Sequence, residues 1–317
     1  MNNITIATFL SNVERFSNDF LELIKFLKKD FNIEIIIFCE KKISNLSNNI
    51  KQIVTPNMTK YKRIEMLIRV SQNDNILCVD NDMIVNKENI KKFIKEIMDK
   101  DYAIAWGKVR TQNIVGFIPH LIKIDKNLSH DFIRPFLWNF NIGISVPGQI
   151  FLISKKYYLN KFQTIDTVYD DLTLGIIAKS NKMPVYFNNF ILGYETPKIN
   201  FKDLLKQRRR WAKGLAESIH NNRYSKSLKY VKIHGFMYHF LWIAYYLIIF
   251  FCSLINYRTG IIIFLLTGLI LSEFKLKDLI YGYAYLLVFP IVHLFWLKSF
   301  IRNLKSLHKN KFVEKGL

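Results

Sequence analysis

The chain has 317 residues, which is enough for one sizeable domain with an appended region or for two domains. Half of its residues are hydrophobic, yet 46 Lys and Arg against 25 Asp and Glu give a formal net charge of +21. This combination is unusual for a plain soluble enzyme and fits a protein that faces anionic lipid or a phosphate-bearing ligand.

The first two hundred residues alternate between short apolar runs and amphipathic stretches. Strands are predicted at 4–10, 33–40 and 75–80, helices at 19–29, 61–70 and near 88–99, and a turn at 81–86. The opening MNNITIATFL lacks the features of a signal peptide, so we expect this region to stay in the cytoplasm. Strands that alternate with helices imply an α/β fold with a mainly parallel sheet, which binds ligands beyond the carboxyl ends of its strands.

After about residue 230 the chain becomes strongly apolar. Residues 236–255 are long enough to cross about 30 Å of hydrocarbon, and 279–297 form a second candidate span that contains Pro290. The shorter run at 260–272 predicts a thin span or a re-entrant helix. Lys and Arg flank the apolar region on both sides, which favours a multi-pass protein of the cytoplasmic membrane with both flanks and the catalytic domain in the cytoplasm.

Two acidic pairs are candidates for chemistry. In CVDNDMIV (78–85), Asp80 and Asp82 follow an apolar strand and point to the same side, so they can hold Mg²⁺ or Mn²⁺. The alternative is a turn that caps the strand. In YDDLTLG (169–175), Asp170 and Asp171 either cap a helix or raise each other's pKa, which would make one of them a general base.

The basic run KQRRRWAKG (206–214) also allows two interpretations. Lys and Arg next to an apolar span commonly mark the cytoplasmic side of a membrane. Gln207 and Trp211, however, are not needed for a stop-transfer cluster. We therefore interpret the run as an active-site element that lies against the membrane.

The order of these motifs resembles the membrane-integrated family-2 glycosyltransferases, the inverting group with the GT-A fold that includes cellulose, hyaluronan and chitin synthases and ceramide glucosyltransferase. The segments that carry the resemblance are DND (80–82), YDDLTLG (169–175), YETP (194–197) and QRRRWAKG (207–214). It implies a GT-A catalytic domain at 1–200, an interfacial amphipathic helix at 201–232, two or three transmembrane segments at 233–300 and a basic cytoplasmic tail at 301–317.

The resemblance also implies roles for particular residues. Asp80 would contact the nucleotide sugar, Asp82 would hold the metal with Asp80, and Asp171 would be the general base. Asp170 stands where the family has glutamate.

Further positions in this resemblance would complete the donor and acceptor sites. Gln207 would contact the nucleotide sugar, Arg210 would neutralise the departing diphosphate, and Trp211 would stack on the acceptor. Gly148 and Gln149 match a glycine-containing stretch near the acceptor. In addition, Thr8 and Glu40 are expected to contact the nucleotide, although the family's usual aspartate-rich segments are missing there.

The expected function is transfer of a sugar from a nucleoside diphosphate sugar, with a UDP-sugar favoured, to a glycan or lipid acceptor of the cell envelope. The product would be a β-linked polysaccharide or a glycolipid. The few predicted spans favour a glycolipid, or polymer synthesis with a homo-oligomer or a partner subunit. The competing hypothesis is a non-catalytic membrane adaptor that binds anionic lipid or a partner synthase. No nucleic-acid-binding module is recognisable, so we expect no nucleic-acid partner.

Overall fold

The computed structural model describes residues 2–10, 16–43, 46, 49–162, 167, 169–198, 200–223 and 225–314, with side chains as far as 307. The last residues of the predicted basic tail, 315–317, lie outside the described part. The chain divides into two compact units. Unit 1 comprises Met1–Arg110 and Ile144–Glu195, and unit 2 comprises Thr111–Gly143 and Thr196–Leu317.

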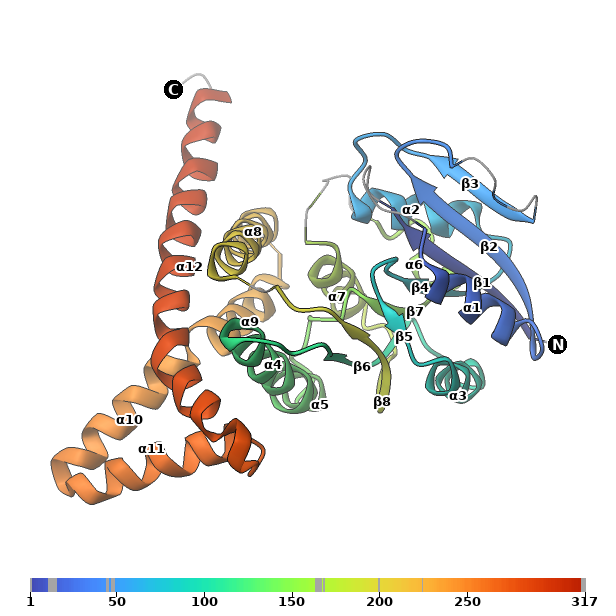
Figure 1. Cartoon of the computed structure of the whole chain (residues 1–317). Coiled ribbons are helices and arrows are strands. Elements are labelled where there is room, and N and C mark those ends of the chain that lie inside the picture. Colours follow the sequence, from blue (N-terminus) through green and yellow to red (C-terminus); the bar gives the residue numbers. More distant parts are fainter. Residues whose placement is uncertain are drawn as a thin grey trace. The chain divides into compact units, whose positions relative to one another are not determined.

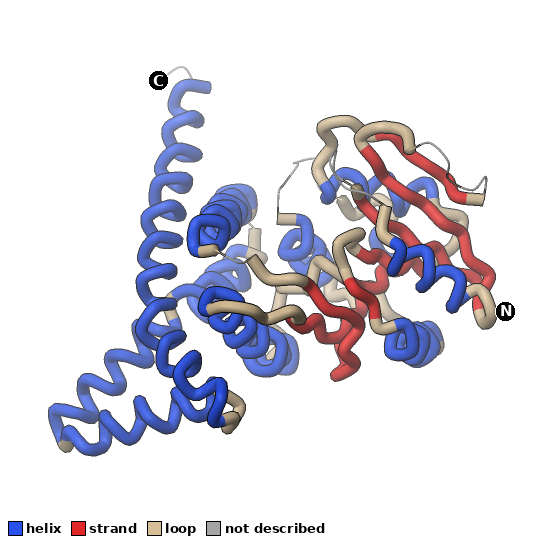
Figure 2. The backbone as a smooth tube through the Cα atoms, in the orientation of Figure 1, coloured by secondary structure: helices blue, strands red, loops and turns tan. Residues whose placement is uncertain are grey.

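Unit 1 is built on a mixed sheet of eight strands in the order β3-β2-β1-β4-β7-β6-β8-β5 (Figure 1, Figure 2). Its strands are β1 (Asn2–Phe9), β2 (Phe31–Cys39), β3 (Ile50–Val54), β4 (Asn75–Val79), β5 (Ile84–Val85), β6 (Ile104–Thr111), β7 (Ile150–Ser154) and β8 (Val185–Glu195). Strands β3, β2, β1 and β4 pair in parallel, whereas β7 pairs antiparallel with β4 and β6. The parallel strands therefore end at the edge of the sheet where β7 begins.

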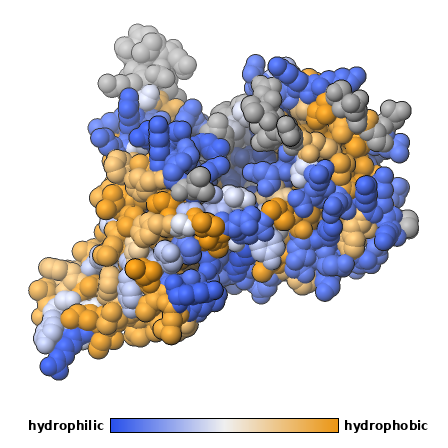
Figure 3. Space-filling view, in the orientation of Figure 1, coloured by the Kyte–Doolittle hydropathy of each residue, from blue (hydrophilic) through white to orange (hydrophobic). Residues whose placement is uncertain are grey.

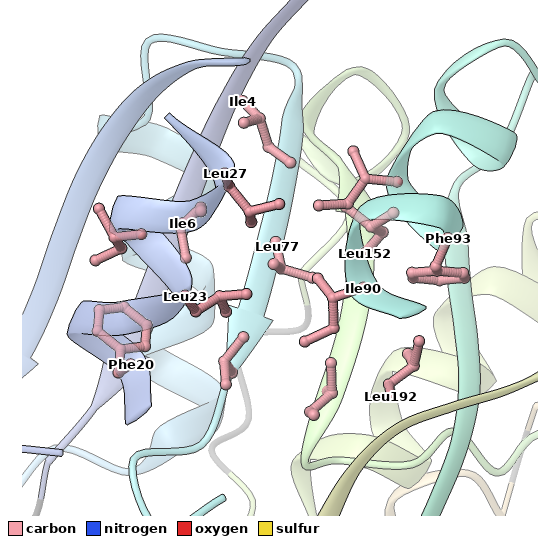
Figure 4. Packing of buried hydrophobic residues seen from close by; sticks show 14 of the residues in the cluster. Ile4, Ile6, Phe20, Leu23, Leu27, Leu77, Ile90, Phe93, Leu152 and Leu192 are labelled. Carbon is pink, nitrogen blue, oxygen red and sulfur yellow. The ribbon is translucent and has the colours of Figure 1, made fainter. Parts of the chain in front are cut away.

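The helices of unit 1 pack on this sheet through apolar side chains at helical spacing. They are α1 (Asn18–Leu27), α2 (Lys60–Val70), α3 (Lys87–Met98), α6 (Lys155–Tyr158) and α7 (Asp170–Ser180). Figure 4 shows the core, in which Phe20 and Leu23 of α1 and Phe93 of α3 lie near Leu77 and Leu152 of the central strands. This burial of apolar surface is the main stabilising contribution to unit 1.

The local sequence pattern predicts most of these elements correctly. The helix expected at 61–70 begins where the Thr59 side chain caps α2 by accepting a hydrogen bond from the backbone of Lys62. The turn expected at 81–86 is wrong in part, because Ile84 and Val85 form the short strand β5. Strand β5 pairs with Gly193 and Tyr194 of β8, and this partner lies more than a hundred residues along the chain.

Unit 2 is helical. Its helices are α4 (Phe117–Leu128), the π-helical turn η1 (Ser129–Ile133), α5 (Arg134–Asn139), α8 (Phe201–Asn221), α9 (Leu228–His239), α10 (Leu241–Ile255), α11 (Tyr257–Leu271), the 3-10 turn η2 (Leu276–Asp278) and α12 (Leu279–Glu314). Helix α12 runs beside α8 (Figure 1). Tyr285 and Phe289 of α12 form a buried cluster with Leu121 and Ile124 of α4. Residues 111–143 are therefore part of the same compact unit as the C-terminal helices.

The apolar stretches form fewer membrane-spanning helices than the sequence predicts. In the described residues one helix, Leu276–Leu307, is long and apolar enough to cross a membrane. The stretch predicted as a span at 236–255 is divided between α9 and α10, which are bent by 55° at Phe240. Helix α11 has 15 residues, which is shorter than a membrane-spanning helix. The Asn256 side chain caps its first turn. At most two spans are supported, and two only if the bent pair counts as one, so the predicted multi-pass arrangement is not supported.

Helices α10 and α11 nevertheless expose an extensive apolar surface. None of the α10 residues is buried. Large exposed side chains include Leu247, Phe250, Phe251, Leu254, Ile261, Leu265 and Leu266. Figure 3 shows hydrophobic residues gathered over this hairpin. Contiguous exposed apolar surface on this scale commonly marks a membrane or a protein interface.

Candidate active site

The residues predicted to bind a ligand in unit 1 lie at the carboxyl ends of the parallel strands. Thr8 is near the end of β1, Glu40 follows β2, and Asp80 follows β4. The backbone N–H of Asp80 donates to the carbonyl of Gln149 at 2.8 Å, just before β7 begins. The sheet therefore brings Asp80, which is expected on the donor side, beside the expected acceptor-side segment, although nearly seventy residues separate them.

Asp80 is paired with a lysine that the sequence did not single out. The Lys60 ammonium at the first position of α2 lies 2.5 Å from Asp80 Oδ1. Burial raises the pKa of Asp80 to about 6 against the attraction of Lys60, and the carboxylates of Asp170 and Asp82 act in the same direction as burial. Burial disfavours the charged form of Lys60, but the attraction of Asp80 and Asp170 prevails and holds the pKa of Lys60 above its ordinary value.

Lys60 also contacts the residues expected on the acceptor side. Its ammonium donates to the backbone carbonyl of Gly148 at 2.7 Å and lies 3.6 Å from Asp170 Oδ2. No sequence signal distinguishes Lys60 among 46 basic residues, except its place at the start of a helix that follows a parallel strand. The structure thus adds one cation to the predicted set of carboxylates.

The second acidic pair begins α7. Asp171 Oδ1 accepts a hydrogen bond from the backbone of Leu172 at 2.7 Å, as a residue in the first turn of a helix can. The Asp171 side chain also lies directly against Gly148, because a Cβ atom built on that glycine would be 3.2 Å from Asp171 Cβ. The pair therefore lies in the first turn of α7, whose N-cap is Tyr169, and beside the other predicted site residues.

Gln149 and Glu195 fix the acceptor-side segment to β8. Gln149 Nε2 donates to Glu195 Oε2 at 3.1 Å, and Glu195 belongs to the YETP segment of the family resemblance. Unit 1 therefore brings together Asp80, Asp170, Asp171, Gly148 and Gln149.

Thr8 and Glu40 lie at the same edge of the sheet but differ in their surroundings. Thr8 is fully buried, and its hydroxyl has no hydrogen-bond partner in the described part of the chain. Glu40 lies 3.5 Å from the buried guanidinium of Arg63. That guanidinium also donates to the carbonyls of Leu10 and Thr55. Arg63 thus joins the chain segments that follow β1, β2 and β3.

The QRRRW motif lies in unit 2, on helix α8. Gln207 and Trp211 are half-buried, whereas Arg209 and Arg210 are exposed. The buried arginine of the motif is Arg208, which donates to Asp125 Oδ2 at 2.5 Å. The Arg208 guanidinium also lies 4.3 Å from the centre of the Trp211 ring. The place of Gln207, Arg210 and Trp211 beside the donor stays a prediction.

Comparison with known proteins decides the family. Residues 75–298 match the family described as "Glycosyl transferase family group 2", and this match covers more than half of the chain. The chain belongs to this family. It is therefore a nucleotide-sugar-dependent glycosyltransferase of EC class 2.4. No curated protein matches the chain in sequence.

Solved structures are similar to this glycosyltransferase. The mannosyltransferase PcManGT from Pyrobaculum calidifontis, in complex with GDP-Man and Mn²⁺, is 12% identical with a TM-score of 0.56; the match covers 95% of this chain and 86% of that one. Glucosyl-3-phosphoglycerate synthase from Mycobacterium tuberculosis, in complex with Mn²⁺, UDP and phosphoglyceric acid, is 10% identical with a TM-score of 0.47; 67% and 76% of the two chains are covered. The likeness to the first concerns a mixed α/β GT-A-like sheet followed by C-terminal helices.

The residues of the glycosyltransferase fit a divalent metal that is bound together with substrate phosphates. The described residues contain no cluster of three or more His, Cys, Asp or Glu side chains that could hold a metal alone. Asp82 is exposed, and Asp80 lies two residues before it. Mg²⁺ is commonly held by one or two carboxylates together with the phosphates of a substrate. The donor set therefore fits Mg²⁺ or Mn²⁺ as the partner of a diphosphate.

Proposed function

We propose that this chain is a membrane-bound inverting glycosyltransferase that moves a sugar from a nucleoside diphosphate sugar, with UDP-sugars favoured, to a glycan or lipid acceptor. The product would be a β-linked cell-envelope polysaccharide or a glycolipid. One observation carries the proposal: in a family-2 chain, Asp80 and the Asp170–Asp171 pair are linked through Lys60 at the carboxyl end of the sheet. Open α/β sheets bind their ligands at this edge.

In this mechanism Asp171 is the general base. The acceptor hydroxyl transfers its proton to the Asp171 carboxylate while its oxygen forms a bond to the anomeric carbon of the sugar. The bond from that carbon to the diphosphate breaks, and its electron pair leaves with the diphosphate. Attack opposite the leaving group inverts the anomeric centre, so an α-linked donor gives a β-linked product.

The leaving diphosphate needs positive charge. The Lys60 ammonium is already paired with Asp80 and lies 3.6 Å from Asp170 Oδ2. A divalent metal held by Asp82 and Asp80 would stabilise charge on the diphosphate. In addition, Arg210 would donate to the diphosphate, because a guanidinium can form two parallel hydrogen bonds with phosphate oxygens. Gln207 would bind beside it, and Trp211 would offer an aromatic face to the acceptor sugar.

The remaining site residues would complete the two binding regions. Thr8 lies near the end of β1, and Glu40 follows the neighbouring strand β2. Both residues would contact the nucleoside. Gly148 and Gln149 would line the acceptor side, where the absence of a side chain at Gly148 leaves room beside Asp171.

Membrane attachment is proposed through unit 2. The exposed apolar side chains of α10 and α11 and the long apolar helix Leu276–Leu307 would be covered by lipid. Exposed basic residues of α8, among them Lys202, Lys206, Arg209 and Lys213, would favour an anionic membrane surface. One or two spans are few for a polymer channel, so a lipid acceptor is favoured over a growing polysaccharide, unless the chain acts as an oligomer or with a partner subunit.

The test is nucleoside diphosphate release by the purified protein in detergent or nanodiscs. The panel would contain UDP- and GDP-sugars with Mn²⁺ or Mg²⁺, and would include a lipid phosphate and an oligosaccharide as acceptors. Metal-dependent release with one donor is expected, and Asp171→Asn should reduce it by about 100-fold or more.

Glu96→Gln is the matched control, because Glu96 is an exposed carboxylate on α3 that pairs with Lys100, two residues after the helix ends. This variant should turn over like the wild type. Absence of both nucleotide binding and turnover with every donor would overturn the proposal in favour of the non-catalytic adaptor.

A further inference from the structure

Lys60 joins segments that come from four separate parts of unit 1. It is the first residue of α2, Asp80 follows β4, Gly148 precedes β7, and Asp170 begins α7. The ammonium lies 2.5 Å from Asp80 Oδ1, 2.7 Å from the Gly148 carbonyl oxygen and 3.6 Å from Asp170 Oδ2. These oxygens belong to the expected donor side, the acceptor side and the pair that holds the base.

We propose that Lys60 is a positioning residue whose ammonium fixes Asp80, Gly148 and Asp170 in one arrangement and so keeps the donor and acceptor sides of the site in register. This inference rests on the proposed function, which assigns one side of the site to the donor and the other to the acceptor. It assigns Lys60 to neither chemical step. Its effect on transfer would come through the position of Asp171, which adjoins Asp170 and lies against Gly148.

The surroundings of Lys60 make this arrangement depend on its charge. The side chains of Lys60, Asp80 and Asp170 are 24%, 27% and 18% exposed, so all are largely removed from water. Carboxylates that share a poorly solvated site repel each other unless a cation lies between them. Without the ammonium, the start of α7 and the segment before β7 would lose their common partner and separate.

Two further contacts hold the Lys60 side chain in place. At its backbone end, Thr59 caps α2 and so fixes the main chain from which Lys60 projects. The ammonium lies 5.6 Å from the centre of the Phe9 ring at the end of β1, a distance within the range of a cation–π interaction. Lys60 therefore has a defined position in the absence of substrate, as a positioning role requires.

The experiment compares Lys60→Met, which keeps length without charge, with Lys60→Arg and Lys60→Ala. Lys62→Met is the matched control, because Lys62 lies two residues further on α2 and pairs with Glu65 of the same helix. The first readout is hydrogen exchange of the substrate-free protein in the peptides that contain 148–152 and 170–175. We expect faster exchange in both peptides for Lys60→Met and no change for Lys62→Met.

The second readout is kinetic. At saturating donor, Lys60→Met should lower kcat for transfer by about 100-fold, the size expected when reacting groups are misplaced by about 1 Å. Donor affinity should fall as well, because the Lys60 ammonium lowers the pKa of Asp80. Lys60→Arg should recover part of this loss. For Lys60→Ala, added n-propylammonium should restore part of the turnover, whereas n-propanol should not, because only the former replaces the charge.

The outcomes separate this inference from the proposed function. Unchanged exchange in either peptide, or a kcat equal to that of the wild type, would overturn the positioning role. It would also be overturned if donor affinity fell while kcat was kept, since Lys60 would then be a simple donor ligand. If exchange increases as expected but the wild type turns over no nucleotide sugar, Lys60 holds the cluster and the proposed function fails.

Discussion

At the scale of single residues, Asp80 is the group whose charge state should control donor binding. Burial raises the pKa of Asp80 to about 6, so the free enzyme gains a proton there as the pH falls through this value. A protonated Asp80 cannot contribute a carboxylate to a metal and is a poorer ligand. Metal-dependent donor binding should therefore be fully present above about pH 7 and should weaken about tenfold for each pH unit below 6.

Titration calorimetry with a non-hydrolysable donor analogue, measured from pH 5 to 8, would check this dependence. An ordinary aspartate would keep donor binding constant over that range, so an affinity that is unchanged at pH 5 would contradict the prediction.

Gly148 should be intolerant of a side chain. A Cβ atom there would lie 3.2 Å from Asp171 Cβ and 3.5 Å from Asp171 Oδ2, so Gly148→Ala requires the Asp171 side chain, the proposed base, to shift by a few tenths of an ångström. We expect kcat to fall by about 10- to 100-fold with a small change in melting temperature. Steady-state kinetics and thermal unfolding would measure both, and a variant as active as the wild type would show that Asp171 can move without loss.

The residue scale also shows what the sequence can reveal about the site. The sequence singles out Asp80 and the Asp170–Asp171 pair as candidates, because carboxylates after a strand or at the start of a helix have recognisable local patterns. Lys60 was not found, because its importance comes from contacts with residues 20 to 110 positions away. Arg208 was missed for the same reason, since its partner Asp125 lies 83 residues earlier in the chain.

At the scale of elements, helix α8 presents neighbouring arginines in different surroundings. Arg208 is buried, and its guanidinium pairs with Asp125, which also accepts a hydrogen bond from Tyr285 of α12 at 3.0 Å. This network joins α8 to α4 and α12. Removal of one partner leaves a poorly solvated charge, so Arg208→Met should lower the free energy of unfolding by about 3 kcal/mol.

Arg209→Met is the control for this prediction, because Arg209 is the next residue and is exposed. Surface substitutions of this kind change the free energy of unfolding by about 0.5 kcal/mol or less. Thermal or denaturant unfolding in detergent would compare the two variants. Equal stability of both would contradict a structural role for the Arg208–Asp125 pair.

The next arginine along α8 should behave in the opposite way. Arg210 is exposed in unit 2, so Arg210→Met should leave the melting temperature unchanged. If Arg210 stabilises the departing diphosphate as proposed, kcat should fall by about 100-fold or more. A variant with wild-type kcat would remove Arg210 from the site, whereas a loss of both stability and activity would identify it as structural.

Elements with a strong local pattern could be predicted, and elements that depend on distant partners could not. The strands β1, β2 and β4 and the helices α1, α2 and α3 follow from hydrophobic spacing and caps. Strand β5 depends on β8, and the bend at Phe240 divides a stretch whose composition alone predicts a continuous span. Hydropathy records length and apolarity, but not where a helix breaks.

At the scale of the whole molecule, the two units are interleaved along the chain. Unit 2 includes Thr111–Gly143, which lies between the two segments of unit 1. In this segment α4 buries Leu121 and Ile124 against Tyr285 and Phe289 of α12, and Ile122 packs with Leu204 of α8. The apolar face of α4 therefore depends on helices that follow residue 200.

A chain truncated after Glu195 should consequently fail to give a stable catalytic domain. It would keep α4 and α5 but lose α8 and α12, which leaves the apolar face of α4 uncovered and Asp125 without Arg208. Exposed apolar faces of this kind promote aggregation. Size-exclusion chromatography of the truncated chain, with and without detergent, should show aggregates and little donor binding.

The truncated chain is compared with a variant that keeps both ends of the chain but has residues 241–271 replaced by a short Gly-Ser linker. Helix α10 has no buried residue and α11 buries Gly260 and Gly268, so this variant removes mainly exposed apolar surface while it keeps α4, α8 and α12. It should fold, bind the donor as the wild type does, and be released from membranes more readily in alkaline carbonate. A soluble, monomeric truncated chain with wild-type donor binding would instead show that unit 1 folds without the C-terminal helices, and that α4 needs no partner from them.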